Sequence, residues 1–187
     1  MNIKIISLDK TFLEEAIAVL NKIFPKQDEE ENVDICFRAS LNYKKYSSIL
    51  KKWNILKLEY FLAIDSDTNK IVGSSGIYEI GGDSDSAWIG WTGVISDYRK
   101  KGVGKKLVSY SIDLAKQRSY KKIKLHTVDI ESQKNAHKLY ESLGFKLIKR
   151  EKEREIGHDR LYYELNLSKD MKNIYIIEHL EPKLWEW

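Results

Sequence analysis

An apolar strand leads into a basic, glycine-containing turn at Val94-Ile95-Ser96-Asp97-Tyr98-Arg99-Lys100-Lys101-Gly102-Val103-Gly104-Lys105-Lys106-Leu107. Glycine at positions 102 and 104 removes the Cβ atom and lets consecutive backbone N–H groups point into one concavity. A helix that begins inside such a turn adds N–H donors and a partial positive charge, so a phosphate group binds well there. The segment is therefore a candidate phosphate-binding loop.

Basic side chains crowd this helix start, although helix starts usually favour Asp and Glu. The cations are Arg99, Lys100, Lys101, Lys105 and Lys106. They are unfavourable at the positive end of a helix dipole unless a bound anion lies between them. Taken alone, the segment is explained equally well by a solvated basic turn whose glycines serve only a tight geometry. The spacing of a P-loop is absent, and so is the third glycine of a dinucleotide-binding fingerprint.

The sequence on both sides of the turn predicts an α/β fold. Alternating and β-branched residues predict strands at 2–8, 58–65, 71–80, 87–95, 123–128, 145–154 and 160–167. Helical spacing predicts helices at 12–24, at 29–53 with a break near Asn42, at 103–118 and at 133–143. Thr11 to Glu14 has the form of a capping box for the first helix. We expect a mixed, mostly antiparallel central sheet flanked by helices on both faces.

Composition is typical of one soluble domain. Of 187 residues, 42% are hydrophobic and 32% are charged, which suffices for a real core. The net charge of +4 is too small to indicate nucleic-acid binding on charge alone. The single cysteine, Cys36, excludes an intramolecular disulfide and a multi-cysteine zinc site, and is expected in the core. The apolar runs are too short for a signal peptide or a membrane span, so we expect a cytoplasmic protein with no membrane contact and no metal.

Two motifs in the right order resemble one known superfamily. Arg99 to Gly104 has the R/Q-x-x-G-x-G/A form, which resembles the acetyl-CoA pyrophosphate loop of the GNAT superfamily of N-acetyltransferases. Asn135-Ala136-His137-Lys138-Leu139-Tyr140-Glu141-Ser142-Leu143-Gly144-Phe145 is similar to the second signature of that superfamily, A-x-x-L-Y-E-x-x-G-F. The predicted element order also fits. We therefore expect a GNAT-like domain over 1–167 and a C-terminal extension over 168–187, docked on the domain or on a second subunit in a homodimer.

The resemblance implies roles for particular residues, with acetyl-CoA as the acyl donor. The pantetheine arm would pair with the strand end at Thr92, Gly93 and Val94. The pyrophosphate would be held by the loop that Arg99 opens, at Lys100, Lys101, Gly102, Val103, Gly104 and Lys105. Tyr140 would protonate the departing CoA thiolate. Many relatives have Asn seven residues before this tyrosine, where this chain has Gln133, and Asn135 lies nearby out of register. Both remain candidate cofactor contacts.

The implied chemistry is direct attack of a neutral amine on the thioester. A backbone N–H near Val94 would stabilise the developing negative charge on oxygen. The general base stays open: the candidates are Glu79, His126, Asp129 and Glu131, each also an ordinary strand or loop residue. No carboxylate occupies the strand before the loop where some relatives place one, so a base that acts through water is our prediction.

Acceptor specificity in this superfamily usually comes from the first helices and the last hairpin. Those regions contain Asp28 to Glu31, Arg38, Tyr43, Tyr46, Trp53, Glu151, Glu153 and His158. Acidic groups would attract a cationic amine, and aromatic rings would stack on it. The same residues equally fit a charged surface and an aromatic core. We expect a small amine, an amino acid or a peptide N-terminus rather than a protein lysine, and an acyl group larger than acetyl stays open.

Two other functions compete with acetyl transfer. A nucleic-acid-binding module would use the basic loop together with Lys121, Lys122 and Lys124. Against this, the basic residues crowd a loop that pyrophosphate already explains. The other alternative is a catalytically silent GNAT-like domain that binds CoA for regulation.

Overall fold

The computed structural model describes residues 1–27, 32–153 and 157–168. The strands are β1 (Ile3–Ser7), β2 (Ile55–Asp65), β3 (Lys70–Ile80), β4 (Ser86–Val94), β5 (Lys122–Val128), β6 (Lys146–Glu153) and β7 (His158–Asn166). The helices are α1 (Leu13–Ile23), α2 (Val33–Leu41), α3 (Tyr43–Lys52), α4 (Val103–Gln117) and α5 (Lys134–Ser142), with short 3-10 helices η1 (Ser96–Tyr98) and η2 (Glu131–Gln133). The strands form one sheet in the order β1-β2-β3-β4-β5-β7-β6.

The predicted mixed, mostly antiparallel sheet is confirmed. Every neighbouring pair is antiparallel except β4 and β5, which run parallel. This parallel pair joins only Ser86–Trp88 to Lys122–Lys124. Both strands continue past the last paired residues without pairing to each other, to Val94 and Val128. The sheet therefore opens between β4 and β5 toward the loop that follows β4.

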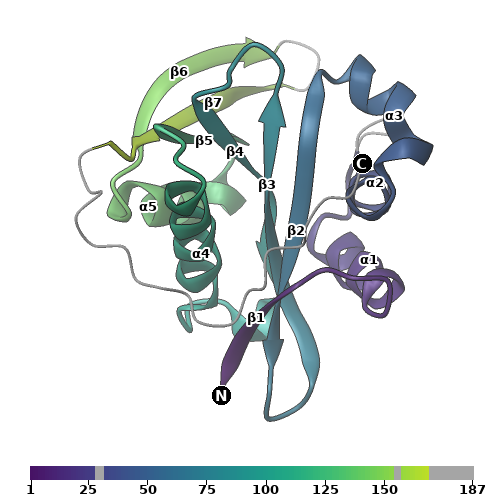
Figure 1. Ribbon diagram of the computed structural model, residues 1–187. Coiled ribbons are helices and arrows are strands. Elements are labelled where there is room, and N and C mark those ends of the chain that lie inside the picture. Colours follow the sequence, from purple (N-terminus) through teal and green to yellow (C-terminus); the bar gives the residue numbers. More distant parts are fainter. Residues whose placement is uncertain (28–31, 154–156, 169–187) are drawn as a thin grey trace.

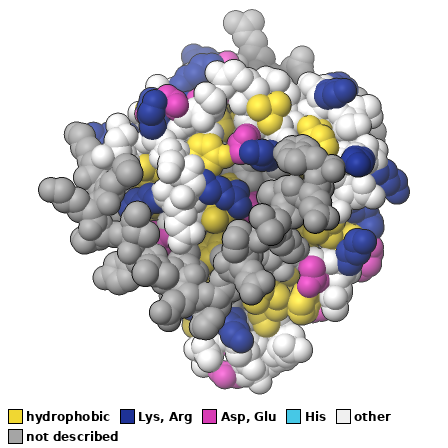
Figure 2. Space-filling view, viewed as in Figure 1, with side chains coloured by type: hydrophobic (Ala, Val, Ile, Leu, Met, Phe, Trp, Pro, Cys, Tyr) yellow, Lys and Arg dark blue, Asp and Glu magenta, His cyan; other side chains and the backbone are white. Residues whose placement is uncertain are grey.

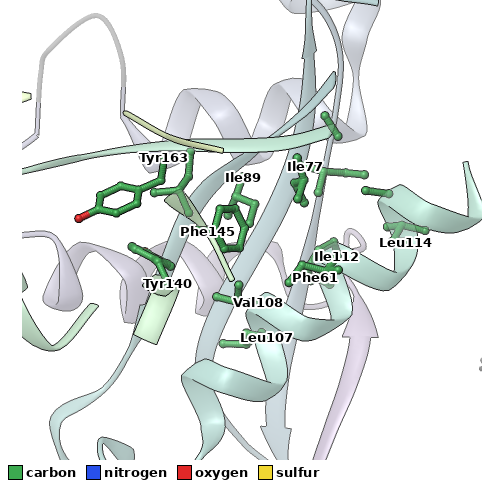
Figure 3. Packing of buried hydrophobic residues seen from close by; sticks show 14 of the residues in the cluster. Phe61, Ile77, Ile89, Leu107, Val108, Ile112, Leu114, Tyr140, Phe145 and Tyr163 are labelled. Atoms are coloured by element: carbon green, nitrogen blue, oxygen red, sulfur yellow. The ribbon is translucent and has the colours of Figure 1, made fainter. Parts of the chain in front are cut away.

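Helices cover both faces of the sheet, as predicted. Figure 1 shows α1, α2 and α3 on one side of the sheet and α4 and α5 on the other. Leu107, Val108 and Ile112 of α4 pack with Ile77 and Ile89 of the sheet in one core (Figure 3). A second core lies under the other helices. Each fully buried aliphatic side chain contributes roughly 1.5–3 kcal/mol, so the two cores fix both layers against the sheet.

The first helices differ from the prediction at their ends. The expected capping box at Thr11 is wrong: α1 has no side-chain cap, and Asp9 Oδ1 accepts the N–H groups of Thr11 at 2.8 Å and Phe12 at 3.2 Å. The carboxylate two residues earlier satisfies these donors instead of the Thr11 hydroxyl. The break near Asn42 is confirmed, because Asn42 ends α2 and its side chain caps α3. One predicted helix is thus two.

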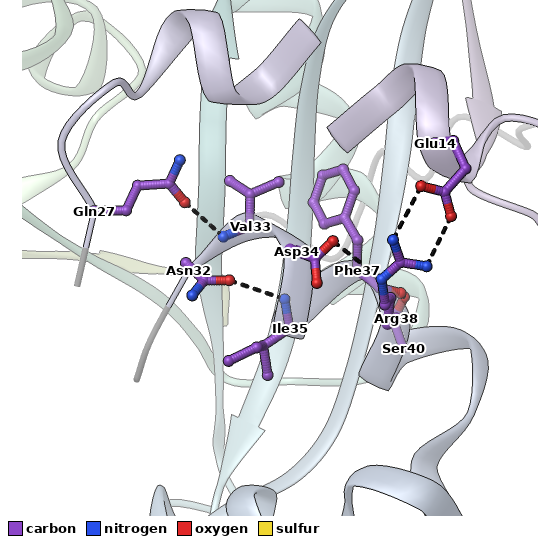
Figure 4. A network of polar contacts seen from close by, with 9 residues as sticks. All are labelled: Glu14, Gln27, Asn32, Val33, Asp34, Ile35, Phe37, Arg38 and Ser40. Atoms are coloured by element: carbon purple, nitrogen blue, oxygen red, sulfur yellow. Dashed lines mark hydrogen bonds and ion pairs between the residues drawn. The ribbon is translucent and has the colours of Figure 1, made fainter. Parts of the chain in front are cut away.

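Polar contacts join α1 to α2. Arg38 forms ion pairs with Glu14 at 2.7 Å and with Asp34 at 3.0 Å, and Asn32 caps α2 (Figure 4). Cys36 of α2 is 2% exposed, which confirms its place in the core. No helix in the described ranges is long and apolar enough to cross a membrane. The predicted acidic start at 28–31 and, apart from Ser168, the predicted extension at 168–187 lie outside the described residues.

Candidate active site

A β-bulge interrupts β4 just before its end. Trp91 and Thr92 together oppose Ser75 of β3, and Trp91 has a positive φ of 44°. The hydroxyl of Ser74 donates to the Trp91 carbonyl oxygen at 2.7 Å, and the Ser75 and Thr92 hydroxyl oxygens lie 2.7 Å apart. A bulge bends a strand and redirects its backbone groups. These serines were not predicted as site residues, because only the strand pairing brings them to the bulge.

Helix α1 closes one face of this strand end. A Cβ atom on Gly93 would lie 2.6 Å from Ile23 Cγ2 and 2.9 Å from Phe24 Cζ, so no side chain fits there. The ring of Phe24 also meets the ring of Trp91 edge to face, with centroids 5.3 Å apart. Ile23 and Phe24 therefore fix the Gly93 backbone from the α1 side of the sheet, and α4 packs on the opposite side of β4.

The predicted phosphate loop has the backbone geometry of an anion site. Lys100 and Gly102 both adopt left-handed φ values, 58° and 83°. Helix α4 begins at Val103, and its N-cap, Gly102, offers no side-chain cap. In the part of the chain that the structure describes, the backbone N–H groups of residues 101–105 have no hydrogen-bond partner. Such free donors at a helix start are what a phosphate group needs.

Three elements converge on this loop. A Cβ atom on Gly104 would lie 3.4 Å from Leu139 Cδ2 of α5 and 3.8 Å from Val94 Cγ2 of β4. The guanidinium Nε of Arg99 donates to the Val94 carbonyl oxygen at 2.9 Å and so ties the loop to the end of β4. The loop thus lies where β4 ends, beside the opening between β4 and β5.

The positive charge of the loop is not neutralised within the described ranges. None of its cations, Arg99, Lys100, Lys101, Lys105 and Lys106, forms a salt bridge there. A hollow of about 470 Å³ beside Arg99 is bordered by three cations, Arg99, Lys22 and Lys70, and by one carboxylate, Glu15. This arrangement favours an anion over a loop that serves only to turn the chain.

Tyr140 lies in the last turn of α5 and is 8% exposed. Its ring centroid lies 6.0 Å from those of Phe145 and Tyr163 (Figure 3). Burial, with a smaller effect of Tyr163, raises the pKa of Tyr140 to about 12. The phenol therefore keeps its proton at physiological pH. Alkyl thiols have a pKa of about 8.5, so the Tyr140 phenol is the weaker acid. Tyr140 is therefore better suited to donate a hydrogen bond to a thiolate than to transfer its proton completely.

The two candidate amides flank the start of α5. Gln133 closes η2 and precedes α5, and Asn135 is exposed in its first turn. Neither side-chain amide has a hydrogen-bond partner among the described residues, so both are free to contact a ligand.

Comparison with known proteins agrees with this geometry. The acetyltransferase (GNAT) family, as a sequence model, matches residues 19–145, which is more than half of the chain. The chain belongs to this family. The GNAT chain is also 31% identical, over 114 residues, to "Probable N-acetyltransferase camello" of Xenopus laevis, a match that covers 57% of this chain and 51% of that protein. It therefore spans about half the length of this curated relative.

Solved structures share the GNAT fold at low sequence identity. Ribosomal-protein-S18-alanine N-acetyltransferase from Escherichia coli superposes with a TM-score of 0.67 at 20% identity, over 93% of this chain and 99% of that one. Arabidopsis thaliana NAA60 in complex with acetyl-CoA gives 0.66 at 16% identity, over 89% of this chain and 99% of that one. At these identities the likeness shows the fold, and it confirms the predicted GNAT-like sheet flanked by helices.

Three of the four candidate bases are carboxylates, and each of them forms an ion pair. Glu79 accepts a hydrogen bond from the Tyr120 hydroxyl and pairs with Lys57 at 3.3 Å. It borders a groove of about 590 Å³ beside the C-terminal part of α4. Asp129 forms an ion pair with Arg150. Glu79 and Asp129 are thus each held in place by a neighbouring side chain.

The other two candidates differ in position. Glu131 is exposed and pairs with Lys134 three residues on. His126 lies on β5, two residues past the last pairing of β5 with β4, with its ring 6.1 Å from that of Tyr162. Its neighbour Leu125 is buried in the core under α4 and α5, so His126 belongs to the opposite face of the sheet. Of the four, His126 borders the open part of the sheet most directly.

The predicted acceptor residues divide between structural and exposed roles. Arg38 holds α1 to α2, and Tyr46 and Trp53 pack against the core under α1–α3. Tyr43 is exposed. Glu151 accepts from the Tyr162 hydroxyl at 2.9 Å. Glu153 and His158 oppose each other in the β6–β7 pair.

An aromatic group that we did not single out lies on the same face as His126. The Trp88 ring stacks on Tyr78 at 6.3 Å and meets Tyr162 edge to face at 6.5 Å. The alternation of β7 could have indicated Tyr162, because its neighbours Leu161 and Tyr163 are buried on the α5 side. These rings extend the candidate acceptor side of the sheet.

The second basic cluster is neutralised by carboxylates. The ion pairs are Lys121–Asp85 at 2.9 Å, Lys122–Glu164 at 3.1 Å and Lys124–Asp83 at 2.8 Å. Figure 2 shows Lys and Arg spread over the visible face instead of gathered in one patch. Both observations weigh against a nucleic-acid surface. In the described ranges no group of three or more His, Cys, Asp or Glu side chains could hold a metal ion.

Proposed function

We propose that this GNAT protein transfers an acetyl group from acetyl-CoA to a primary amine of a small molecule, an amino acid or a peptide. The observation that carries the proposal is the row of backbone N–H groups at residues 101–105, which have no hydrogen-bond partner among the described residues and lie beside the opening between β4 and β5. Acetyl-CoA would supply an activated thioester. The loop would bind its pyrophosphate through these N–H groups and the surrounding cations.

The remaining residues would orient the reactants and move protons. The bulged backbone near Val94 would pair with the pantetheine arm and offer an N–H to the thioester oxygen. Tyr140 would donate a hydrogen bond to the leaving sulfur, since burial keeps its phenol protonated. The amine would approach from the face that carries Trp88, His126 and Tyr162, where a base acting through water would remove its proton.

Calorimetric titration with acetyl-CoA tests the cofactor. We expect micromolar binding that requires the pyrophosphate, with dephosphorylated pantetheine as the control. Release of free thiol in the presence of a panel of amines, amino acids and short peptides then tests the reaction and its acceptor. No binding at millimolar acetyl-CoA would refute the proposal. A strongly salt-dependent affinity for RNA or DNA that CoA does not affect would favour the nucleic-acid module instead.

A catalytically silent CoA-binding domain is the second candidate. The observation behind it is the packing of the Tyr140 ring against Phe145 and Tyr163, which gives this tyrosine a structural role that needs no catalysis. This alternative predicts that the protein binds CoA but transfers acetyl to no amine tested. It also predicts that Tyr140→Phe causes no loss of function. Thiol release above the uncatalysed rate would exclude it.

We also propose a cytoplasmic site of action. Cys36 is the single cysteine of the chain and is buried without a disulfide, which fits a reducing compartment. Fractionation of cells that produce the full chain tests this proposal. We expect the protein in the soluble cytoplasmic fraction, and its recovery in another fraction would contradict the proposed location.

A further inference from the structure

Tyr98, the residue before Arg99, is tied to a hairpin far away in the sequence. Its hydroxyl donates a hydrogen bond of 2.7 Å to Oδ2 of Asp65. Asp65 is the last residue of β2 and is only 4% exposed. Its other carboxylate oxygen, Oδ1, accepts the N–H of Asp67 at 3.1 Å. One buried carboxylate is therefore shared between the β2–β3 turn and the start of the phosphate loop.

The β2–β3 hairpin is a firm support for this bond. Asp65 is paired on both sides, with Ile3 of β1 and Lys70 of β3. Its carbonyl oxygen accepts the N–H groups of Thr68 at 3.2 Å and Asn69 at 2.7 Å. The backbone and the side chain of Asp65 are thus both held in place, so the carboxylate is a fixed point relative to the sheet.

The loop itself has little internal support. The N–H groups of Tyr98 and Arg99 bond to Ile95 and Ser96 at 3.0 and 3.1 Å. From there to Lys106, whose N–H bonds to the Gly102 carbonyl oxygen, the described residues give the loop no backbone hydrogen bond. Lys100 also holds a left-handed φ of 58°, which is unfavourable for a residue with a side chain. Such a conformation persists only when its surroundings enforce it.

We propose that Asp65 and Tyr98 are positioning residues that hold the phosphate-binding loop in the conformation in which its N–H groups face the ligand. This inference rests on the proposed function. A hydrogen bond to a buried carboxylate is charge-assisted and stronger than one between neutral groups. In agreement, the bond from Tyr98 is the main cause that lowers the pKa of Asp65. Lys101 also lies over the Tyr98 ring, with Nζ 5.5 Å from its centroid, so the same tyrosine reaches two parts of the loop.

Tyr98→Phe removes the hydroxyl and keeps the ring. We expect the Kd for CoA in calorimetric titration to rise about tenfold, which corresponds to about 1.4 kcal/mol. Amide hydrogen exchange at residues 99–105 should become faster in the ligand-free full chain, with the other helices unchanged. Ser40→Ala, which removes a hydroxyl that donates to the Phe37 carbonyl oxygen at 2.8 Å on α2, is the control and should change neither readout.

Asp65 provides the complementary variants. Asp65→Asn keeps an oxygen that can accept from Tyr98 and should retain most of the CoA affinity. Asp65→Ala should weaken binding as much as Tyr98→Phe, and the double variant should be no weaker than either single one, because both remove the same bond. An additive loss in the double variant would contradict the shared role.

The test separates this inference from the proposed function. If the unchanged protein does not bind CoA, the proposed function fails, while faster exchange confined to residues 99–105 in Tyr98→Phe would still support the positioning role. Unchanged affinity and unchanged exchange in Tyr98→Phe would overturn it. Faster exchange throughout the chain, with a lowered melting temperature, would also overturn it, because the bond would then serve the whole fold and not the loop.

Discussion

Gly104 in the first turn of α4 lies directly against Leu139 of α5: a Cβ atom at Gly104 would sit 3.4 Å from Leu139 Cδ2. This is an ordinary van der Waals distance, so a methyl group fits, whereas a longer side chain must turn toward the loop. The contact brings the two sequence motifs together, because Leu139 precedes Tyr140 and Gly104 ends the glycine pair. Helices α4 and α5 thus meet at the proposed phosphate site.

Gly104→Glu should abolish CoA binding without unfolding the protein. The new carboxylate would stand among the free N–H groups and repel the pyrophosphate, and we expect the Kd to rise by at least about 100-fold, or about 2.8 kcal/mol. Gly104→Ala is the control and should bind nearly normally. Calorimetric titration and circular dichroism measure both properties. Retained affinity in the glutamate variant would refute the loop assignment.

Tyr140→Phe should lower turnover by roughly 100-fold with little change in the Kd for CoA, if the phenol assists departure of the thiolate. The reason is that only the hydroxyl is lost while the ring stays packed beside Phe145. Steady-state kinetics at saturating acetyl-CoA measures this. Tyr163→Phe serves as the control for packing, since its ring lies 6.0 Å from that of Tyr140. Equal turnover in the wild type and in Tyr140→Phe would return Tyr140 to a structural role.

Stability should fall at alkaline pH because of Tyr140. Burial raises the pKa of Tyr140 to about 12, while an unfolded tyrosine has a pKa of about 10. Above pH 10 the unfolded chain loses this proton and the folded chain keeps it, so rising pH favours unfolding. The stabilisation is complete below about pH 10 and falls by up to about 2–3 kcal/mol toward pH 12. Urea unfolding at pH 9 and 11 tests this.

The matched variant for this pH effect is again Tyr140→Phe. Its free energy of unfolding should decrease less than that of the wild type between pH 9 and pH 11, because it lacks this titrating group. Tyr110, whose pKa burial also raises to about 12, should contribute in the same direction in both proteins. A parallel decrease in wild type and variant would contradict the assignment to Tyr140.

Ser74→Ala should loosen the bulge that shapes the end of β4. It removes the 2.7 Å hydrogen bond to the Trp91 carbonyl oxygen, and Trp91 holds a positive φ that needs such support. We expect a loss of about 1–2 kcal/mol in the free energy of unfolding and weaker CoA binding. Ser142→Ala, which loses a comparable bond to Leu139 at the exposed end of α5, should leave CoA affinity unchanged. If Ser74→Ala binds CoA as tightly as Ser142→Ala, the bulge does not contribute to cofactor binding.

Local chemistry was enough to predict the helix start and the glycine turn of the candidate site. The glycines at 102 and 104, the helix that follows them and the crowded cations all indicate an anion at the loop, and each lies within a few residues of the next. The prediction failed at Thr11, because a carboxylate two residues earlier competes for the same N–H groups. The break near Asn42 was predicted correctly, because Asn is a local signal for a helix end and a helix cap.

The sequence alone determined the element order, the helices on both faces of the sheet and the GNAT resemblance, because hydrophobic period, turn residues and short motifs are local properties of the chain. The bond between Tyr98 and Asp65, the support of Trp91 by Ser74 and the meeting of Gly104 with Leu139 came only from the folded structure. Each joins residues from different elements, and strand pairing and helix packing decide which of many polar groups become neighbours. The same holds for the opening between β4 and β5, since a strand's sequence does not say where its pairing stops.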